Sequence, residues 1–226
     1  MQAKHQAGLE AARLTGYTIA DIPDLCRETI IMKLLSGPTS PFARKCRIVA
    51  IEKSVTLDEI GTNPFESTEL PGINPLKMIP VLILDDGTTM YDSDVICRYL
   101  DQAGEGPSLF PKADRWAWMT RATLGHGLAD ASVALQLQKV LPESDQSAPL
   151  MDKMRARMAR TTAGLEADLA GLEAAPMRMD VICAVMGLGH VELRHGDAWR
   201  ADHPNLTAWY LGQLERPSFK ATIPVG

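Results

Sequence analysis

The sequence is poor in cysteine and aromatic residues, and it lacks a hydrophobic run long enough to cross a membrane. Its 226 residues include four cysteines and 5% aromatic residues. Cys26, Cys46, Cys97 and Cys183 show neither metal-ligand spacing nor the density of a disulfide framework, so we expect reduced thiols and no metal site. A bilayer span needs about 20 apolar residues, and no charged segment with an apolar core and cleavage site opens the chain. We therefore expect a cytoplasmic protein with no membrane partner.

The chain also lacks an excess of positive charge. Its 23 basic and 28 acidic residues give a formal net charge of -5. Such a balance disfavours non-specific attraction to the phosphates of nucleic acids, so we expect no nucleic-acid partner. The length allows one large or two small domains with a substantial core.

Residues 1–30 are expected to be an N-terminal extension. They begin with an Ala-rich stretch and are then interrupted at Gly16 and Pro23. Terminal segments with few bulky apolar residues are often poorly ordered, so we place this extension outside the folded domains.

A β-α-β unit is predicted next. Ile31–Leu35 is an apolar strand, Pro41–Lys53 a helix and Val55–Ile60 a second strand. A crossover of this length joins parallel strands with a right-handed connection. Prolines and a glycine then interrupt residues 61–78, which predicts a loop with at most a short helix.

A hairpin and a helix complete the first domain. Val81–Leu84 and Thr88–Met90 flank an Asp-Asp-Gly turn, which favours antiparallel pairing. Ser93 is the expected N-cap of a helix that runs to Gln102. The order β-α-β-loop-β-β-α is that of a thioredoxin-like domain, to which we assign residues 31–103. Glycines and prolines make residues 104–113 a linker.

Residues 114–226 are predicted to form an all-α second domain. Asp114 is the expected cap of its first helix, and a loop is expected at Pro142–Pro149. The expected helices are Arg115 to about Val140, Leu150–Leu172, about Asp180–Glu192 and Pro204–Glu215. The fold class is therefore an α/β domain followed by an all-α domain.

The first predicted helix carries the main candidate site. Pro41 is tolerated in a first helical turn, which puts Ser40 at the N-cap beside the positive end of the helix dipole. A bound anion or thiolate would be stabilised there. The alternative is that Ser40 only caps the helix.

Four local motifs resemble the glutathione S-transferase superfamily, and within it the bacterial YibF-like members. They are Thr39–Lys45 (TSPFARK), Asn74–Leu82 (NPLKMIPVL), Tyr91–Ser93 leading into Ile96–Leu100, and Trp209-Tyr210 with Arg216–Phe219. The resemblance covers the chain from Met32 onward. It implies a thioredoxin-like domain followed by helices, glutathione as co-substrate, and a homodimer.

The resemblance also implies roles for residues of these motifs. Ser40, or Thr39 after a one-residue shift of the loop, would donate a hydrogen bond to the glutathione sulfur; its cap position favours Ser40. Ile79 would pair its backbone with glutathione before a cis proline, Pro80. Asp92 would take the ammonium of an α-amino acid, and Ser93 its carboxylate, unless the pair is simply an N-cap. The implied glutathione-binding residues are Ser40, Phe42, Lys77, Ile79, Pro80, Asp92 and Ser93.

Two features depart from the family pattern. Lys77-Met78 replaces a glycine followed by a long polar residue, so the contact with the glycyl carboxylate falls to Lys77 or glutathione affinity is lower. In the family a Ser or Thr three residues before an Asp usually caps the core helix of the second domain. Here Met177 stands three residues before Asp180, and methionine cannot cap.

A second-substrate cleft is expected against the first helix of the helical domain. Met119, Thr123, His126 and Asp130 recur there at helical spacing. Such a stripe is also typical of interface packing, and a structural role is favoured for His126.

The function that the resemblance implies is conjugation of glutathione to an electrophilic, mostly apolar small molecule. One alternative is a glutathione-dependent peroxidase or ether-cleaving enzyme at the same site. Another is a non-catalytic scaffold that is similar to the stringent starvation proteins.

Overall fold

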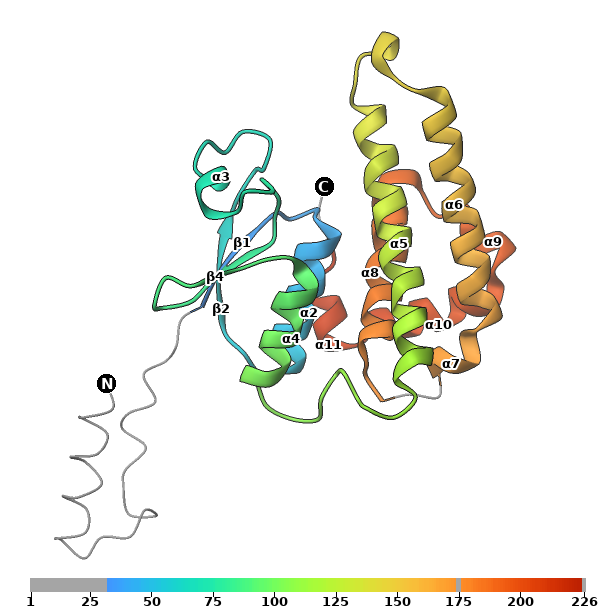
Figure 1. The fold of residues 1–226 in the computed structure, drawn as a ribbon. Coiled ribbons are helices and arrows are strands. Elements are labelled where there is room, and N and C mark those ends of the chain that lie inside the picture. The colour runs from blue at the N-terminus through green and yellow to red at the C-terminus, as the bar shows by residue number, and fades with distance from the viewer. Residues whose placement is uncertain (1–31, 174–175, 225–226) are drawn as a thin grey trace, which may run out of the picture. The chain divides into compact units, whose positions relative to one another are not determined.

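The computed structural model describes residues 32–173 and 176–224. The predicted extension at residues 1–30 lies outside these ranges. A four-stranded mixed sheet in the described part has the strand order β2-β1-β3-β4, which matches the predicted thioredoxin-like order (Figure 1). Its strands are β1 (Met32–Ser36), β2 (Leu57–Gly61), β3 (Val81–Ile83) and β4 (Thr89–Met90).

The pairing of the strands follows the prediction. β1 pairs with β2 in parallel and with β3 in antiparallel orientation, and β3 pairs with β4 as a hairpin. Leu34 and Leu82 face each other in the β1–β3 register and are fully buried. The predicted loop at 61–78 contains only the short helix α3 (Leu70–Ile73) among its described elements.

Two helices lie between this sheet and the C-terminal helices (Figure 1). They are α2 (Pro41–Glu52) and α4 (Ser93–Ala103), which pack against each other. Ile48 and Val49 of α2 and Ile96 and Leu100 of α4 are fully buried. α2 also packs against the helical region, so the start of α2 is held from both sides.

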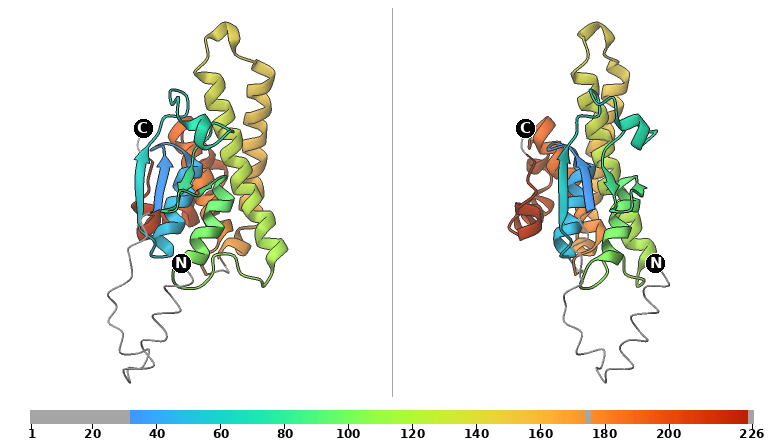
Figure 2. Two further views of the ribbon diagram at one scale, coloured as in Figure 1. Left: turned by 60° about the vertical axis from the view of Figure 1, so that its left-hand side comes forward. Right: turned by 90° about the vertical axis from the view of Figure 1, so that its left-hand side faces the viewer.

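The C-terminal region is helical, as predicted. α5 (Arg115–Lys139) and α6 (Ala148–Ala167) run side by side and project beyond the sheet (Figure 2). α8 (Met179–His195) packs against α5, and its residues 179–191 are all buried. The remaining elements are η2 (Glu143–Asp145), α7 (Leu169–Glu173), α9 (Trp199–Asp202), α10 (Pro204–Leu214) and α11 (Pro217–Lys220).

Three details of this region differ from the prediction. The expected helix at 150–172 is divided at Asp168 into α6 and α7. Asp114 stands at the N-cap of α5, but its side chain makes no capping hydrogen bond. Its backbone is left-handed, with φ at 48°, whereas a capping side chain needs an extended backbone. The short helices α9 and α11 were not predicted.

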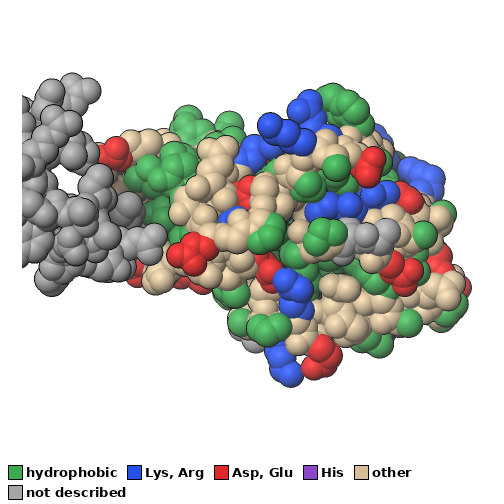
Figure 3. Space-filling view, turned by 90° about the horizontal axis from the view of Figure 1, so that it is seen from below, with side chains coloured by type: hydrophobic (Ala, Val, Ile, Leu, Met, Phe, Trp, Pro, Cys, Tyr) green, Lys and Arg blue, Asp and Glu red, His purple; other side chains and the backbone are tan. Residues whose placement is uncertain are grey.

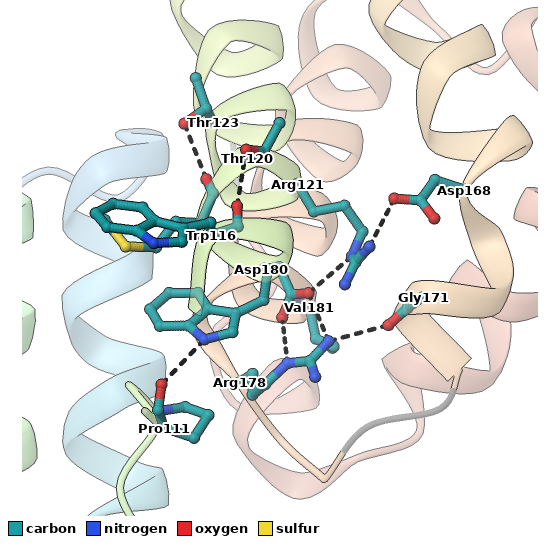
Figure 4. Close-up of polar contacts among 12 residues, drawn as sticks. Pro111, Trp116, Thr120, Arg121, Thr123, Asp168, Gly171, Arg178, Asp180 and Val181 are labelled. Carbon is teal, nitrogen blue, oxygen red and sulfur yellow. Dashed lines mark hydrogen bonds and ion pairs between the residues drawn. The ribbon is translucent and has the colours of Figure 1, made fainter. Parts of the chain in front are cut away.

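Buried charges hold the start of α8 in place of a conventional cap (Figure 4). Asp180 is fully buried. Arg121 of α5 donates from Nε to Asp180 Oδ2 at 3.0 Å, and Arg178 donates from Nη2 to the same oxygen at 2.7 Å. Asp180 Oδ1 accepts the N–H of Val181 at 3.1 Å. Arg121 also donates from Nη1 to Asp168 Oδ2 at 2.6 Å. This network joins α5, the end of α6 and the start of α8.

The surface carries both signs of charge. On the face shown in Figure 3, Lys and Arg are interspersed with Asp and Glu, and hydrophobic side chains are scattered among them. No helix in the described ranges is long and apolar enough to cross a membrane. The described residues also contain no group of three or more His, Cys, Asp or Glu side chains placed to hold a metal ion.

Candidate active site

A cavity of about 1030 Å³ lies between the loops of the sheet region and two C-terminal helices. The loops line it with residues 37–42, 61–65 and 77–79. Val133, Gln136 and Leu137 of α5 and His190 and Arg194 of α8 line its other side. Both predicted hydroxyl donors, Thr39 and Ser40, lie on its wall.

Ser40 caps α2, as predicted. Its backbone is extended (φ -71°, ψ 119°), and its Oγ accepts the N–H of Ala43 at 3.2 Å. Pro41 occupies the first helical position. Capping uses a lone pair of the hydroxyl oxygen, so the hydroxyl hydrogen stays free to donate. An anion near Ser40 would therefore meet both this donor and the positive end of the helix dipole.

The loop before Pro80 is shaped by a buried amide. Asn74 Nδ2 donates to the carbonyl of Met78 at 2.8 Å, and Asn74 Oδ1 accepts the N–H of Leu76 at 3.0 Å. The Ile79–Pro80 peptide bond is cis, as predicted. Lys77 is exposed and lines the cavity together with Met78 and Ile79. The sequence analysis gave Asn74 no role, although an Asn before a Pro is a common turn signal.

The cap of α4 corrects the prediction for Ser93. Asp92, not Ser93, is the N-cap residue, and its Oδ1 accepts the N–H of Asp94 at 3.0 Å. The helix begins one residue earlier than expected, because the carboxylate of Asp92 satisfies a free N–H of the first turn. Ser93 is then the first helical residue and is buried, whereas Asp92 is exposed. Neither lines the 1030 Å³ cavity.

A buried lysine behind the cavity was not predicted. Lys45 of α2 is fully buried, and its Nζ contacts Asp94 Oδ1 of α4 and lies 3.4 Å from His126 Nδ1 of α5. The His126 ring in turn lies 5.2 Å from the Phe42 ring, between centroids. Burial alone would raise the pKa of Asp94, but the charge and hydrogen bond of Lys45 lower it. Through Lys45, α2 is linked to Asp94 of α4 and to His126 of α5. The sequence did not predict that Lys45 is buried, because a lysine in a helix is usually exposed.

Replacing Asp94 should lower the free energy of unfolding more than replacing Lys45. Asp94→Ala leaves the Lys45 ammonium buried beside His126, so we expect a loss of about 1–3 kcal/mol in the free energy of unfolding. Lys45→Met removes the buried charge itself and should cost less than about 1 kcal/mol. Urea unfolding of both variants checks the order, and equal losses would contradict it.

The predicted second-substrate residues do not line this cavity, although the His126 ring contacts Phe42, which does. Met119, Thr123 and His126 are not among its lining residues. Thr123 Oγ1 donates to the carbonyl of Met119 at 2.9 Å, within α5 (Figure 4). The residues of α5 that line the cavity, Val133, Gln136 and Leu137, lie toward its C-terminal end. Met119, near the start of the helix, packs against the main core instead.

His190 is a buried histidine on the cavity wall. Its Nδ1 lies 2.7 Å from Ser132 Oγ. Burial, and then the charges of Arg194 and His195, lower the pKa of His190 to about 4. The imidazole is therefore neutral near pH 7.

This lowered pKa gives a pH dependence with a definite sign. In the unfolded chain a histidine has a pKa of about 6.5, so the unfolded state takes up the proton first. Stability should thus fall as the pH decreases from about 6.5 to about 4, by about 3 kcal/mol for this group. His190→Asn does not titrate there, and denaturant unfolding at several pH values should show a shallower loss. An unchanged loss would contradict this assignment.

Comparisons with known proteins agree with this fold. Residues 39–103 match the model of the glutathione S-transferase N-terminal domain. The GST-like protein YibF of Escherichia coli (strain K12) is 27% identical over 199 residues, which cover 85% of this chain and 98% of YibF. A stringent starvation protein A homologue of Coxiella burnetii is 37% identical over 83 residues, which cover 36% of this chain and 39% of that protein.

The similarity extends to solved structures. A glutathione transferase family member from Pseudomonas fluorescens Pf-5, solved with bound glutathione, is 36% identical with a TM-score of 0.80, and the match covers 86% of this chain and 100% of that one. Because a relative of this identity is matched along its whole length, the chain belongs to the glutathione S-transferase superfamily.

Proposed function

We propose that the protein is a glutathione transferase that joins the glutathione sulfur to an electrophilic, mostly apolar small molecule. One observation carries this proposal: Ser40 caps α2 on the wall of a large cavity, with its hydroxyl hydrogen unused by the cap. A helix N-terminus and a hydroxyl donor both favour a thiolate over a thiol. The relative from Pseudomonas fluorescens with bound glutathione supports the choice of thiol.

The residues around Ser40 suit a tripeptide with charged ends. In this proposal the backbone of Ile79 pairs with the cysteinyl residue of glutathione beside Pro80. Lys77 takes the glycyl carboxylate, and Asp92 takes the γ-glutamyl ammonium. The first N–H groups of α4, beginning at Ser93, take the adjacent carboxylate.

The rest of the cavity would hold the electrophile. Phe42, Phe65, Met78, Val133 and Leu137 supply apolar wall around the position of the sulfur. Holding both reactants there supplies part of the rate, and the thiolate supplies the nucleophile. We also propose that residues 31–103 form the glutathione-binding domain, and that the electrophile lies between this domain and the helical domain of residues 114–226.

The protein is proposed to act as a homodimer. The family resemblance implies this state, and Val95 of α4 and Trp116 of α5, which are 48% and 70% exposed, are apolar side chains that a contact between subunits could cover. Light scattering of the purified protein gives the mass directly, and a monomer at micromolar concentration would contradict this part of the proposal.

Calorimetric titration with glutathione, followed by a panel of electrophiles, tests the function. Binding with conjugation of aryl halides or Michael acceptors supports the transferase. Turnover of hydroperoxides or aryl ethers alone would instead support the peroxidase or ether-cleaving alternative. Absence of binding at millimolar glutathione would favour the non-catalytic scaffold. The similarity to a stringent starvation protein A homologue is the reason for considering this alternative.

A further inference from the structure

Arg194 is a cation on the cavity wall with no anionic partner in the part of the chain that the structure describes. It lies in the last turn of α8 and is partly buried. Its neighbours are engaged: His190 lies 2.7 Å from Ser132 Oγ, and His195 Nδ1 lies 2.9 Å from Lys139 Nζ. Among the described residues, no carboxylate forms an ion pair with Arg194.

The surroundings of Arg194 are positive. Burial is the main cause of the lowered pKa of His190 and of His195; the charge of Arg194 lowers both further, and Lys139 and Arg155 also act on His195. Two cationic residues, Lys77 and Arg194, line the cavity together with the neutral His190. The lining contains no Asp or Glu. The negative end of the α8 dipole accounts for a cation in the last turn. It does not account for a guanidinium that borders the cavity, where a bound anion would form charge-assisted hydrogen bonds with it.

Glutathione leaves this cation unused. In the proposed function, Lys77 and Asp92, which both belong to the sheet region, take the charged ends of the tripeptide. Arg194 belongs to the helical side, together with Val133 and Leu137. We propose that Arg194 binds a carboxylate on the electrophile, so that the preferred second substrate is an apolar or aromatic molecule carrying one carboxylate. This inference rests on the proposed function and names its substrate class.

An aryl halide that carries a carboxylate is a suitable probe. The thiol proton leaves to solvent, and the thiolate electron pair forms a C–S bond to the ring carbon that carries chlorine. The C–Cl bond then breaks, and chloride leaves with its electron pair. No oxidant or reductant is needed.

The experiment compares 4-chloro-3-nitrobenzoate with its neutral amide, 4-chloro-3-nitrobenzamide. The ratio of their kcat/KM values, each divided by the uncatalysed rate, is measured for the wild type, Arg194→Leu, Arg194→Lys and Arg157→Leu. Arg157 is an exposed arginine of α6 and serves as the matched control for loss of one positive charge. We expect Arg194→Leu to lower the benzoate-to-benzamide ratio by about tenfold. The lysine variant should keep part of the ratio, and Arg157→Leu should keep all of it.

Binding of the two S-aryl glutathione products provides a second readout that needs no turnover. Tighter binding of the carboxylate product, lost in Arg194→Leu, supports the inference even if the wild type conjugates neither probe. The transferase proposal alone fails if the wild type also conjugates no other electrophile of the panel. Conjugation with an equal ratio in the wild type and Arg194→Leu overturns the inference and leaves the transferase standing. If neither product binds the wild type, both proposals fall.

Discussion

Ser40→Ala is expected to lower kcat/KM for glutathione conjugation by about 10–100-fold, which is the effect of losing one hydrogen bond to a charged group. The Ser40 hydroxyl caps α2 through its oxygen, and in the proposed function its hydrogen is donated to the glutathione sulfur. Without that donor, the bound thiol should lose its proton only at higher pH. The pH–rate profile should therefore move upward by about one unit, as steady-state kinetics across the pH range would reveal.

The same substitution removes a helix cap, so a control must separate the two effects. Ser147 caps α6 by accepting the N–H of Leu150 at 3.4 Å, away from the cavity. Ser147→Ala should cost about 1 kcal/mol of stability or less and leave conjugation unchanged. Thr39→Val tests the other hydroxyl of the loop. Full activity of Ser40→Ala with loss of activity in Thr39→Val would transfer the role to Thr39.

Asp180→Ala is expected to cost about 3–5 kcal/mol in the free energy of unfolding, because it breaks a buried charge network. Asp180 is fully buried and accepts from Arg121 and Arg178. Its loss leaves the Arg178 guanidinium without its carboxylate and leaves Arg121 paired with Asp168 alone. It also frees the N–H of Val181 at the start of α8. Unfolding in guanidinium chloride, monitored by circular dichroism, measures the loss in the free energy of unfolding.

An exposed aspartate gives the matched comparison. Asp152 bonds Arg155 at 2.7 Å on the surface of α6, and exposed pairs of this kind contribute about 0.2–1 kcal/mol. Asp152→Ala should therefore be close to the wild type. Equal losses in the two variants would mean that burial of Asp180 does not set the strength of its network.

The order of elements followed from local signals in the sequence. The apolar run of β1, the proline that opens α2 and the Asp-Asp-Gly turn before β4 each act over a few residues. The start of α4 was missed by one residue within a local motif, whereas the end of α6 depends on a contact between distant segments. Asp168 stands where α6 ends, and its carboxylate pairs with Arg121 of α5. No local pattern of residues 150–172 reports this contact.

The candidate site was predictable where motifs carry it and not where packing does. Ser40 and the cis Ile79–Pro80 bond lie in short motifs and were found at their expected places. Lys45 and Arg194 were missed, since their importance depends on burial and on which helices meet. Helical spacing predicted a stripe of residues on α5, but it does not give the position along the helix that borders the cavity, which is at Val133, Gln136 and Leu137.

The central claim is that Ser40 and the start of α2 acidify the thiol of bound glutathione. Titration of that thiol by ultraviolet difference absorbance of the thiolate, with the protein saturated by glutathione, measures it directly. The account predicts a pKa well below the value of about 8.5 for a free thiol, and a smaller shift in Ser40→Ala. A thiol that titrates in the wild-type complex as it does in water would contradict the account.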